Sequence, residues 1–183
     1  MKANKFVMIL VILMLGSLLN VYSQKEPKKL KCKYDVEKKD EFTGADYKSV
    51  KIRMTVKQNL TLMMYNFEFF KNGTDYTLQV NYPLMGNIRD IIPKGEEMLI
   101  KLANGEMLKL YVAAETVPAV QISGESIYTT YMIKFPIAVD DITKMSTSYP
   151  TNYKFAIGSL NVQNVIEEKD GEKLSNVCKC LLQ

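Results

Sequence analysis

The sequence predicts a β-rich α+β domain, a mostly antiparallel sheet or sandwich of about eight or nine strands with two helices. Three observations predict this class. Apolar and polar residues alternate through much of the chain after residue 33, turn-forming pairs such as Asn-Gly and Gly-Ser separate the alternating runs, and helical spacing occurs only near residues 140–148 and at the C-terminus.

The N-terminal segment has the pattern of a secretory signal peptide. Two lysines precede an apolar and small-residue run from Phe6 to Leu19, and Ser23 offers a small side chain for cleavage. A helix that spans a bilayer needs about 20 apolar residues, and this run ends sooner, at Asn20. We therefore expect residues 1–23 to be removed between Ser23 and Gln24, which leaves no stable membrane anchor.

Residues 24–32 are predicted to form a basic arm ahead of a single domain over residues 33–183. The arm carries a cluster of lysines around Pro27, but no aromatic residue lies among them. The whole chain has a net charge of +4, which falls to about +2 without the signal peptide. This near balance favours a solvated tether, and we expect no nucleic-acid partner.

Three cysteines, Cys32, Cys178 and Cys180, remain after export to an oxidising compartment. An odd number permits one disulfide and leaves one thiol, so Cys32 is expected to pair with Cys178 or Cys180. Three unpaired thiols are the alternative. If the C-terminal segment is a helix, Cys178 faces the core and Cys180 is the more accessible thiol unless a bridge to Cys32 reorients it.

The first strands are predicted from alternation and turn chemistry. Apolar residues from Val50 to Val56 alternate with polar ones, as in a sheet with one wet face. The Asn72-Gly73 pair favours a two-residue type I′ turn, which would place Phe69 opposite Tyr76 and Phe67 opposite Leu78.

Two further hairpins follow from local sequence. A three-residue loop over residues 103–105, with Gly105 in a left-handed conformation, keeps the apolar residues of both strands on one face. Gly158-Ser159 predicts another tight turn. The pairs expected from the two hairpins are Ile100 with Leu108, Met98 with Leu110, Ile157 with Leu160, and Phe155 with Val162.

The remaining elements are a strand over residues 127–135, a short strand near residues 117–122, and the two helices. The expected inward face of the strand holds Ile127, Tyr131, Ile133 and Phe135. Asp140 is predicted to cap a helix to Ser148 with Ile142 and Met145 facing inward. Helical spacing at the C-terminus places four residues in one stripe: Leu174, Val177, Cys178 and Leu181.

Two segments carry a resemblance. The sequence Lys-Asp-Glu-Phe-Thr-Gly at residues 39–44 and Lys-Gly-Glu-Glu-Met-Leu-Ile-Lys-Leu-Ala-Asn-Gly-Glu at residues 94–106 resemble uncharacterised exported proteins of Bacteroidota. The resemblance implies a location in the periplasm or outside the cell and carries no known activity. From the residues themselves, Phe42 is expected in the core, and Gly44 and Lys94-Gly95 in turns.

The chain contains no histidine, which excludes several catalytic sites. Ser-His-Asp and Cys-His nucleophile systems and zinc sites with imidazole ligands cannot be built. Cys178-Lys179-Cys180 lacks the C-x-x-C spacing of common redox motifs. We therefore predict no catalytic residue, no metal ligand and no cofactor.

Adjacent acids are weak candidates for a shared proton. Asp140-Asp141 suits a helix start, and the paired glutamates at 96–97 and 167–168 would point to opposite faces of a strand. A glycosidase built from distant carboxylates, such as Glu68 and Glu106, stays open because its acids need only meet in space.

The tyrosines divide into two predicted groups. Tyr128 and Tyr149 are candidates for an exposed aromatic patch. The others considered are assigned to the core by alternation: Tyr65, Tyr76, Tyr82, Tyr131 and Tyr153. The triplets at Asn59 and Asn72 match the glycosylation pattern, although a bacterial origin would leave both unused.

These observations favour an exported, soluble protein with a non-catalytic binding or structural role in the cell envelope and a ligand that the sequence does not identify. One alternative is a histidine-free hydrolase or glycan-active enzyme that uses carboxylates. Another is a surface-recognition or inhibitor protein that presents the loops at Asn72-Gly73 or residues 85–90. The sequence assigns no oligomeric state.

Overall fold

The computed structural model describes residues 30–58 and 61–183, and residues Cys32–Gln183 form one compact unit. The predicted signal peptide, its cleavage position at Ser23 and Gln24, most of the basic arm, and Asn59 lie outside the described residues. Within the described part of the chain, no helix is long and apolar enough to cross a membrane.

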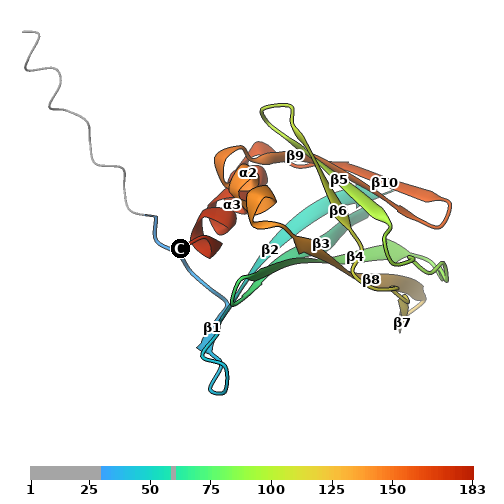
Figure 1. Ribbon diagram of the computed structural model, residues 1–183. Coiled ribbons are helices and arrows are strands. Elements are labelled where there is room, and N and C mark those ends of the chain that lie inside the picture. The colour runs from blue at the N-terminus through green and yellow to red at the C-terminus, as the bar shows by residue number, and fades with distance from the viewer. Residues whose placement is uncertain (1–29, 59–60) are drawn as a thin grey trace, which may run out of the picture. The chain divides into compact units, whose positions relative to one another are not determined.

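The compact unit contains two antiparallel sheets (Figure 1). The larger has six strands in the order β1-β2-β3-β4-β8-β7, and the smaller has four in the order β10-β9-β5-β6. The strands of the larger sheet are β1 (Val36–Lys39), β2 (Asp46–Gln58), β3 (Thr61–Asn72), β4 (Asp75–Met85), β8 (Ser126–Ile137) and β7 (Ala119–Ser123). Those of the smaller sheet are β10 (Leu160–Val165), β9 (Pro150–Ile157), β5 (Glu97–Leu102) and β6 (Met107–Tyr111).

The predicted fold class is confirmed, with ten strands in the described residues in place of eight or nine. The strand that the sequence did not indicate is β1. All four of its side chains are exposed, so it shows no alternation of buried and exposed residues from which a strand could be inferred.

An aromatic core joins the inner faces of the two sheets. Tyr65 and Phe67 of β3 and Tyr82 of β4 meet Tyr153 and Phe155 of β9, with ring centroids 5.4–5.8 Å apart across the sheets. Such tilted and edge-to-face pairs stabilise a core beyond the area that they bury. The five predicted core tyrosines are all buried, which confirms that assignment: Tyr65, Tyr76, Tyr82, Tyr131 and Tyr153.

Helix α2 (Val139–Thr147) follows β8 directly, and helix α3 (Glu168–Leu181) ends the fold. Both cover the same end of the two sheets (Figure 1). Ile142 and Met145 of α2 are buried as predicted. The predicted cap is wrong: the N-cap is Ala138 rather than Asp140, because β8 stays paired with β4 up to Ile137 and the helix begins at once.

Helix α3 docks closely on the start of β9. Its apolar stripe is confirmed, with Leu174, Cys178 and Leu181 buried in the core. Gly171 permits the approach, since a Cβ at this position would lie 2.5 Å from the carbonyl oxygen of Pro150. The Ser175 hydroxyl donates a buried hydrogen bond of 2.9 Å to Ser146 of α2, which ties the two helices together.

The predicted register of the first hairpin is wrong by two residues. Asn72 pairs with Asp75, so Phe69 lies opposite Leu78, and the turn contains Gly73 and Thr74. A shift of two residues leaves every side chain on its original face. The apolar pattern therefore could not distinguish the two registers, although it identified the buried face correctly.

The other two hairpins have the predicted registers. Met98 pairs with Leu110 and Ile100 with Leu108, around a three-residue loop in which Gly105 has a φ of 89°. Across the Gly158 turn, Ile157 pairs with Leu160 and Phe155 with Val162. In the first of these hairpins, a two-residue turn at Asn104-Gly105 would have shifted the pairing by one residue and divided the apolar residues between two faces, so here the pattern did fix the register.

Phe42 corrects another prediction, since its side chain is 97% exposed rather than in the core. It lies in the turn between β1 and β2. There the Asp40 carboxylate accepts hydrogen bonds from the backbone N–H groups of Phe42 and Thr43, which directs the ring outward. Gly44 completes this turn with a φ of 70°, and Lys94-Gly95 forms the turn before β5, both as expected.

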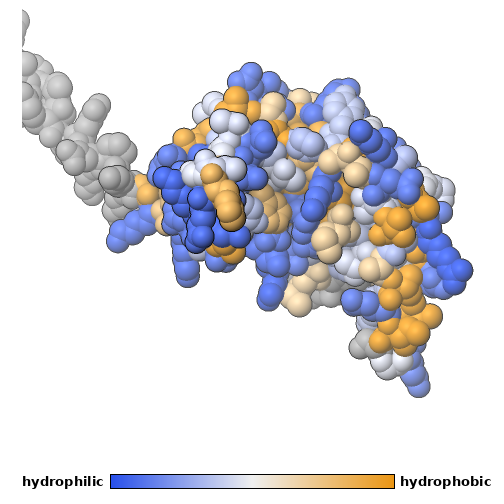
Figure 2. Space-filling model, turned by 60° about the horizontal axis from the view of Figure 1, so that its bottom comes forward, coloured by the Kyte–Doolittle hydropathy of each residue, from blue (hydrophilic) through white to orange (hydrophobic). Residues whose placement is uncertain are grey.

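The surface facing forward in Figure 2 is mostly polar, but apolar residues gather along the side of the view on which β7 lies. Strand β7 itself exposes two apolar side chains, Val120 and Ile122, which are 45% and 76% exposed. This apolar surface contrasts with the hydrophilic residues that occupy most of the remaining view.

Candidate binding face

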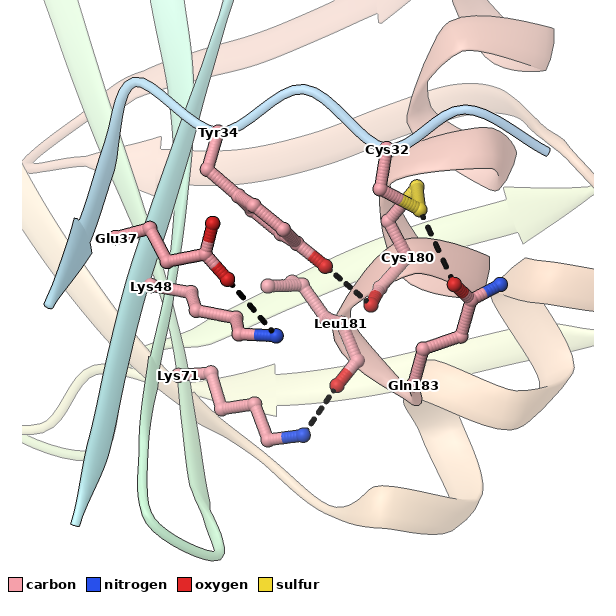
Figure 3. The surroundings of a disulfide bond; sticks show 8 residues. All are labelled: Cys32, Tyr34, Glu37, Lys48, Lys71, Cys180, Leu181 and Gln183. Carbon is pink, nitrogen blue, oxygen red and sulfur yellow. Dashed lines mark hydrogen bonds and ion pairs between the residues drawn. A yellow bond between two sulfur atoms is a disulfide. The ribbon is translucent and has the colours of Figure 1, made fainter. Parts of the chain in front are cut away.

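The C-terminus of α3 is joined to the chain before β1 by a disulfide between Cys32 and Cys180 (Figure 3). The two Cα atoms are 5.4 Å apart, which is ordinary disulfide geometry. Of the two partners that the sequence left open for Cys32, the structure selects Cys180. Cys178 remains a free thiol in the core, and burial raises its pKa to about 12.

Polar contacts surround this disulfide and satisfy the end of α3. The Tyr34 hydroxyl donates to the Cys180 carbonyl at 2.9 Å, and the Lys71 ammonium donates to the Leu181 carbonyl at 2.7 Å (Figure 3). A helix C-terminus has unpaired carbonyl groups and a partial negative charge, so both donors stabilise it. This junction is a structural clamp, since every polar group named here already has a partner within the fold.

The structure does not bring the candidate acids together. Glu68 of β3 is paired with Lys51 at 3.9 Å, and Glu106, in the turn before β6, is paired with Lys144 at 2.8 Å. The hydrogen bond from Lys144 lowers the pKa of Glu106, which favours the ionised form. The two carboxylates thus lie on a strand of the larger sheet and in a turn of the smaller one, and they belong to different ion pairs.

The adjacent acids also have structural positions. Asp140 and Asp141 lie in the first turn of α2, where the helix dipole favours negative charge. Within the described ranges, no group of three or more cysteine and acidic side chains could hold a metal ion. The expectation of an exposed patch at Tyr128 and Tyr149 is wrong, because both are only half-exposed: Tyr128 packs against the core, and Tyr149 donates to Glu168 at 3.2 Å.

The candidate binding face is the outer face of the smaller sheet. Its side chains alternate with the core residues of β5, β6, β9 and β10, and cross-strand pairing aligns them in rows. One row runs Lys109, Leu99, Lys154 and Gln163. We define the binding face as Glu97, Leu99, Lys101, Met107, Lys109, Tyr111, Asn152, Lys154, Asn161 and Gln163.

Two shallow hollows meet on this face. One has a volume of about 240 Å³ and includes Lys101, Asn152 and Gln163, and the other has about 210 Å³ and includes Glu97 and Asn161. Leu99 and Lys154 line both hollows, so these form one continuous depression across β9. A third hollow lies between the helices, and neither Glu68 nor Glu106 lines any of the three.

The electrostatics of the binding face are cationic. Glu97 is its one acid, and it pairs with the Lys109 ammonium at 3.2 Å and lies 3.5 Å from the Tyr111 hydroxyl. In the part of the chain that the structure describes, Lys101 and Lys154 belong to none of the ion pairs. Two ammonium groups therefore remain to meet a ligand, beside the amides of Asn152, Asn161 and Gln163.

Known proteins supply no further identification. No protein-family model, curated protein or solved structure matches the chain. The resemblance to exported proteins of Bacteroidota therefore stays a prediction.

The sequence did not identify the binding face as a site. The polar residues of β5 and β9 were visible as the wet positions of alternating strands, which is the ordinary pattern of any exposed sheet face. They become a site because β5 pairs with β9, which makes Leu99 and Lys154 neighbours although they lie far apart in the sequence. Alternation within one strand gives no information on such a distant neighbour.

Proposed function

We propose that this chain is an exported binding protein whose binding face holds an extended anionic glycan without chemical conversion. Export is supported by the apolar N-terminal run and by the Cys32–Cys180 disulfide, which suits an oxidising compartment. The ligand class rests on one observation: the two hollows join at Lys154, and Lys101 lines one of them. Neither lysine belongs to an ion pair among the described residues.

The residue types suit a charged sugar polymer. Ammonium groups attract carboxylates, while the amides of Asn152, Asn161 and Gln163 can both donate to and accept from hydroxyl groups. An open, shallow depression along a sheet accommodates a chain that continues past both ends. A small ligand would instead require a pocket that encloses most of its surface.

The test is titration of the full exported protein with polygalacturonate and with a neutral glucan of the same length. We expect binding of the anionic polymer only, and weakening with added salt because the attraction is between exposed charges. Lys154→Glu should weaken binding about tenfold or more, equivalent to roughly 1.4 kcal/mol.

The matched control is Lys134→Glu, which makes the same charge change on β8 of the larger sheet. Equal losses in the two variants would show a non-specific charge effect and reject the binding face as the site. New reducing ends during incubation would instead support the carboxylate enzyme. Equal affinity for the neutral glucan would reject the anionic ligand.

A further inference from the structure

Strand β7 ends the larger sheet, and its outer edge has no partner strand in the described part of the chain. Its face toward the smaller sheet is also incompletely covered. Val120 and Ile122 lie on this face together with Ile127 of β8, which is 38% exposed although the sequence placed it with core residues. An exposed, apolar sheet edge is a surface on which another strand can pair.

The backbone of β7 points the required groups outward. The Ile127 carbonyl accepts a hydrogen bond of 2.8 Å from the N–H of Gly86, so it points away from β7. Ile122, which is paired with Ile127, therefore makes no ladder bonds to it. In an antiparallel ladder such pairs alternate with bonded ones, so Val120 and Ile122 direct their N–H and C=O groups to the free edge.

The geometry points to a second copy of this chain as the occupant, with its β7 antiparallel to the first about a two-fold axis at Gln121. Val120 then faces Ile122 of the second copy, and each pair exchanges both backbone hydrogen bonds. Between these two pairs, Gln121 of one copy faces Gln121 of the other at a position where the two residues exchange no backbone hydrogen bonds. The result is a continuous sheet through both copies, with four β7 apolar side chains side by side.

The sequence of β7 supports pairing with itself. The five residues of β7 are symmetric in character about Gln121: an apolar residue lies on each side of it, and a small residue lies at each end. A two-fold rotation about Gln121 therefore places apolar residues opposite apolar ones and small residues opposite small ones. The strand contains no charged residue, so a second copy brings no like-charge repulsion along the ladder. Two facing primary amides can donate to and accept from one another.

The first test is disulfide trapping. Gln121→Cys would place two thiols opposite each other at a non-hydrogen-bonded pair. The Cα atoms of such a pair are about 4.5 Å apart, a separation that a disulfide can bridge. We expect a covalent dimer on mild oxidation of the full exported protein. Gln163→Cys is the matched control, an exposed glutamine on the edge strand β10, and it should remain monomeric.

The second test is the reversible dimer itself, measured by sedimentation velocity from about 1 µM to about 1 mM, because a five-residue strand pair makes a small and weak interface. Ile122→Lys should raise the dimer dissociation constant at least about tenfold. Val165→Lys is the control, since Val165 has the same exposed fraction, 76%, on β10.

Equal trapping of both cysteine variants, or a native protein that stays monomeric throughout, would overturn the proposal. So would a dimer that Ile122→Lys leaves intact. Retention of the native circular dichroism spectrum by all four variants ensures that lost association is not lost folding, and their exposed positions favour this result.

Discussion

The two edges of the larger sheet differ in charge and in attachment. At one edge, β1 contains Glu37, Lys38 and Lys39, and the chain just before it is bound to α3 through Cys32. At the other edge, β7 is uncharged and exposes Val120 and Ile122. One edge is protected by charge and by covalent attachment, while the other has neither.

This difference shows how one sheet can keep one edge closed and leave the other available. Charged residues on an edge strand oppose pairing with another chain because their ammonium or carboxylate groups would lose water or meet like charges. At β1 the stabilising contacts are with the protein itself: Lys48 of β2 pairs with Glu37 at 3.4 Å and lies over the Tyr34 ring. The comparison predicts that changes at the β1 edge alter stability, while changes at the β7 edge alter association.

The largest expected effect at the β1 edge is removal of the disulfide. Cys32 and Cys180 are 148 residues apart in sequence, so the bond restricts most of the unfolded chain. Replacing both by alanine should lower the free energy of unfolding by about 3–5 kcal/mol, measured by urea denaturation. Cys178→Ala is the control and should cost about 1–2 kcal/mol, since only a small buried group is lost. A smaller loss in the double variant than in the control would contradict this.

The same edge shows where the sequence could and could not predict the fold. Cys32 and two possible partners were evident, but the choice depended on the orientation of α3, which Gly171 and Pro150 set by close packing. Strand β1 and the outward position of Phe42 were missed. Both depend on hydrogen bonds around Asp40 and pairing with β2, and neither leaves a periodic apolar pattern.

Local hairpins were predicted better than distant pairings. The turn at Gly105 fixed the register of β5 with β6, whereas β4 with β8 and β5 with β9 pair across long stretches of sequence. The candidate binding face depends on the second of these distant pairs, because Leu99 and Lys154 become neighbours only there. Sequence alternation could therefore indicate each strand of the site but not the site.

A smaller effect is expected from Lys71, which holds the C-terminal end of α3 to β3. Lys71→Met should lower the free energy of unfolding by about 1–2 kcal/mol, since the partly buried Leu181 carbonyl loses a charged donor at 2.7 Å. Lys71→Arg keeps the charge and should restore most of this stability. If the methionine variant unfolds at the same urea concentration as the native protein, the contact does not stabilise the helix end.

The smallest of the three effects concerns Lys48, and it depends on pH. Partial burial lowers the pKa of Lys48. The interactions of its ammonium group with Tyr34 and Glu37 raise the pKa, and their combined effect exceeds that of burial, so the pKa lies above the ordinary value of 10.5. A raised folded-state pKa stabilises the fold fully below the unfolded-state value, and this stabilisation is lost as pH rises through the folded-state value. Lys48→Met should therefore cost up to about 1 kcal/mol at neutral pH, and the difference from the native protein should shrink above about pH 10.5.

Urea denaturation of both proteins between about pH 7 and about pH 11 measures this difference. Lys51→Met is the control, because Lys51 is 46% exposed and its partner Glu68 is 3.9 Å away. That exposed pair should contribute at most a few tenths of a kcal/mol. A Lys48→Met difference that stays constant through the alkaline range would show that ionisation of the ammonium over Tyr34 does not stabilise the β1 edge.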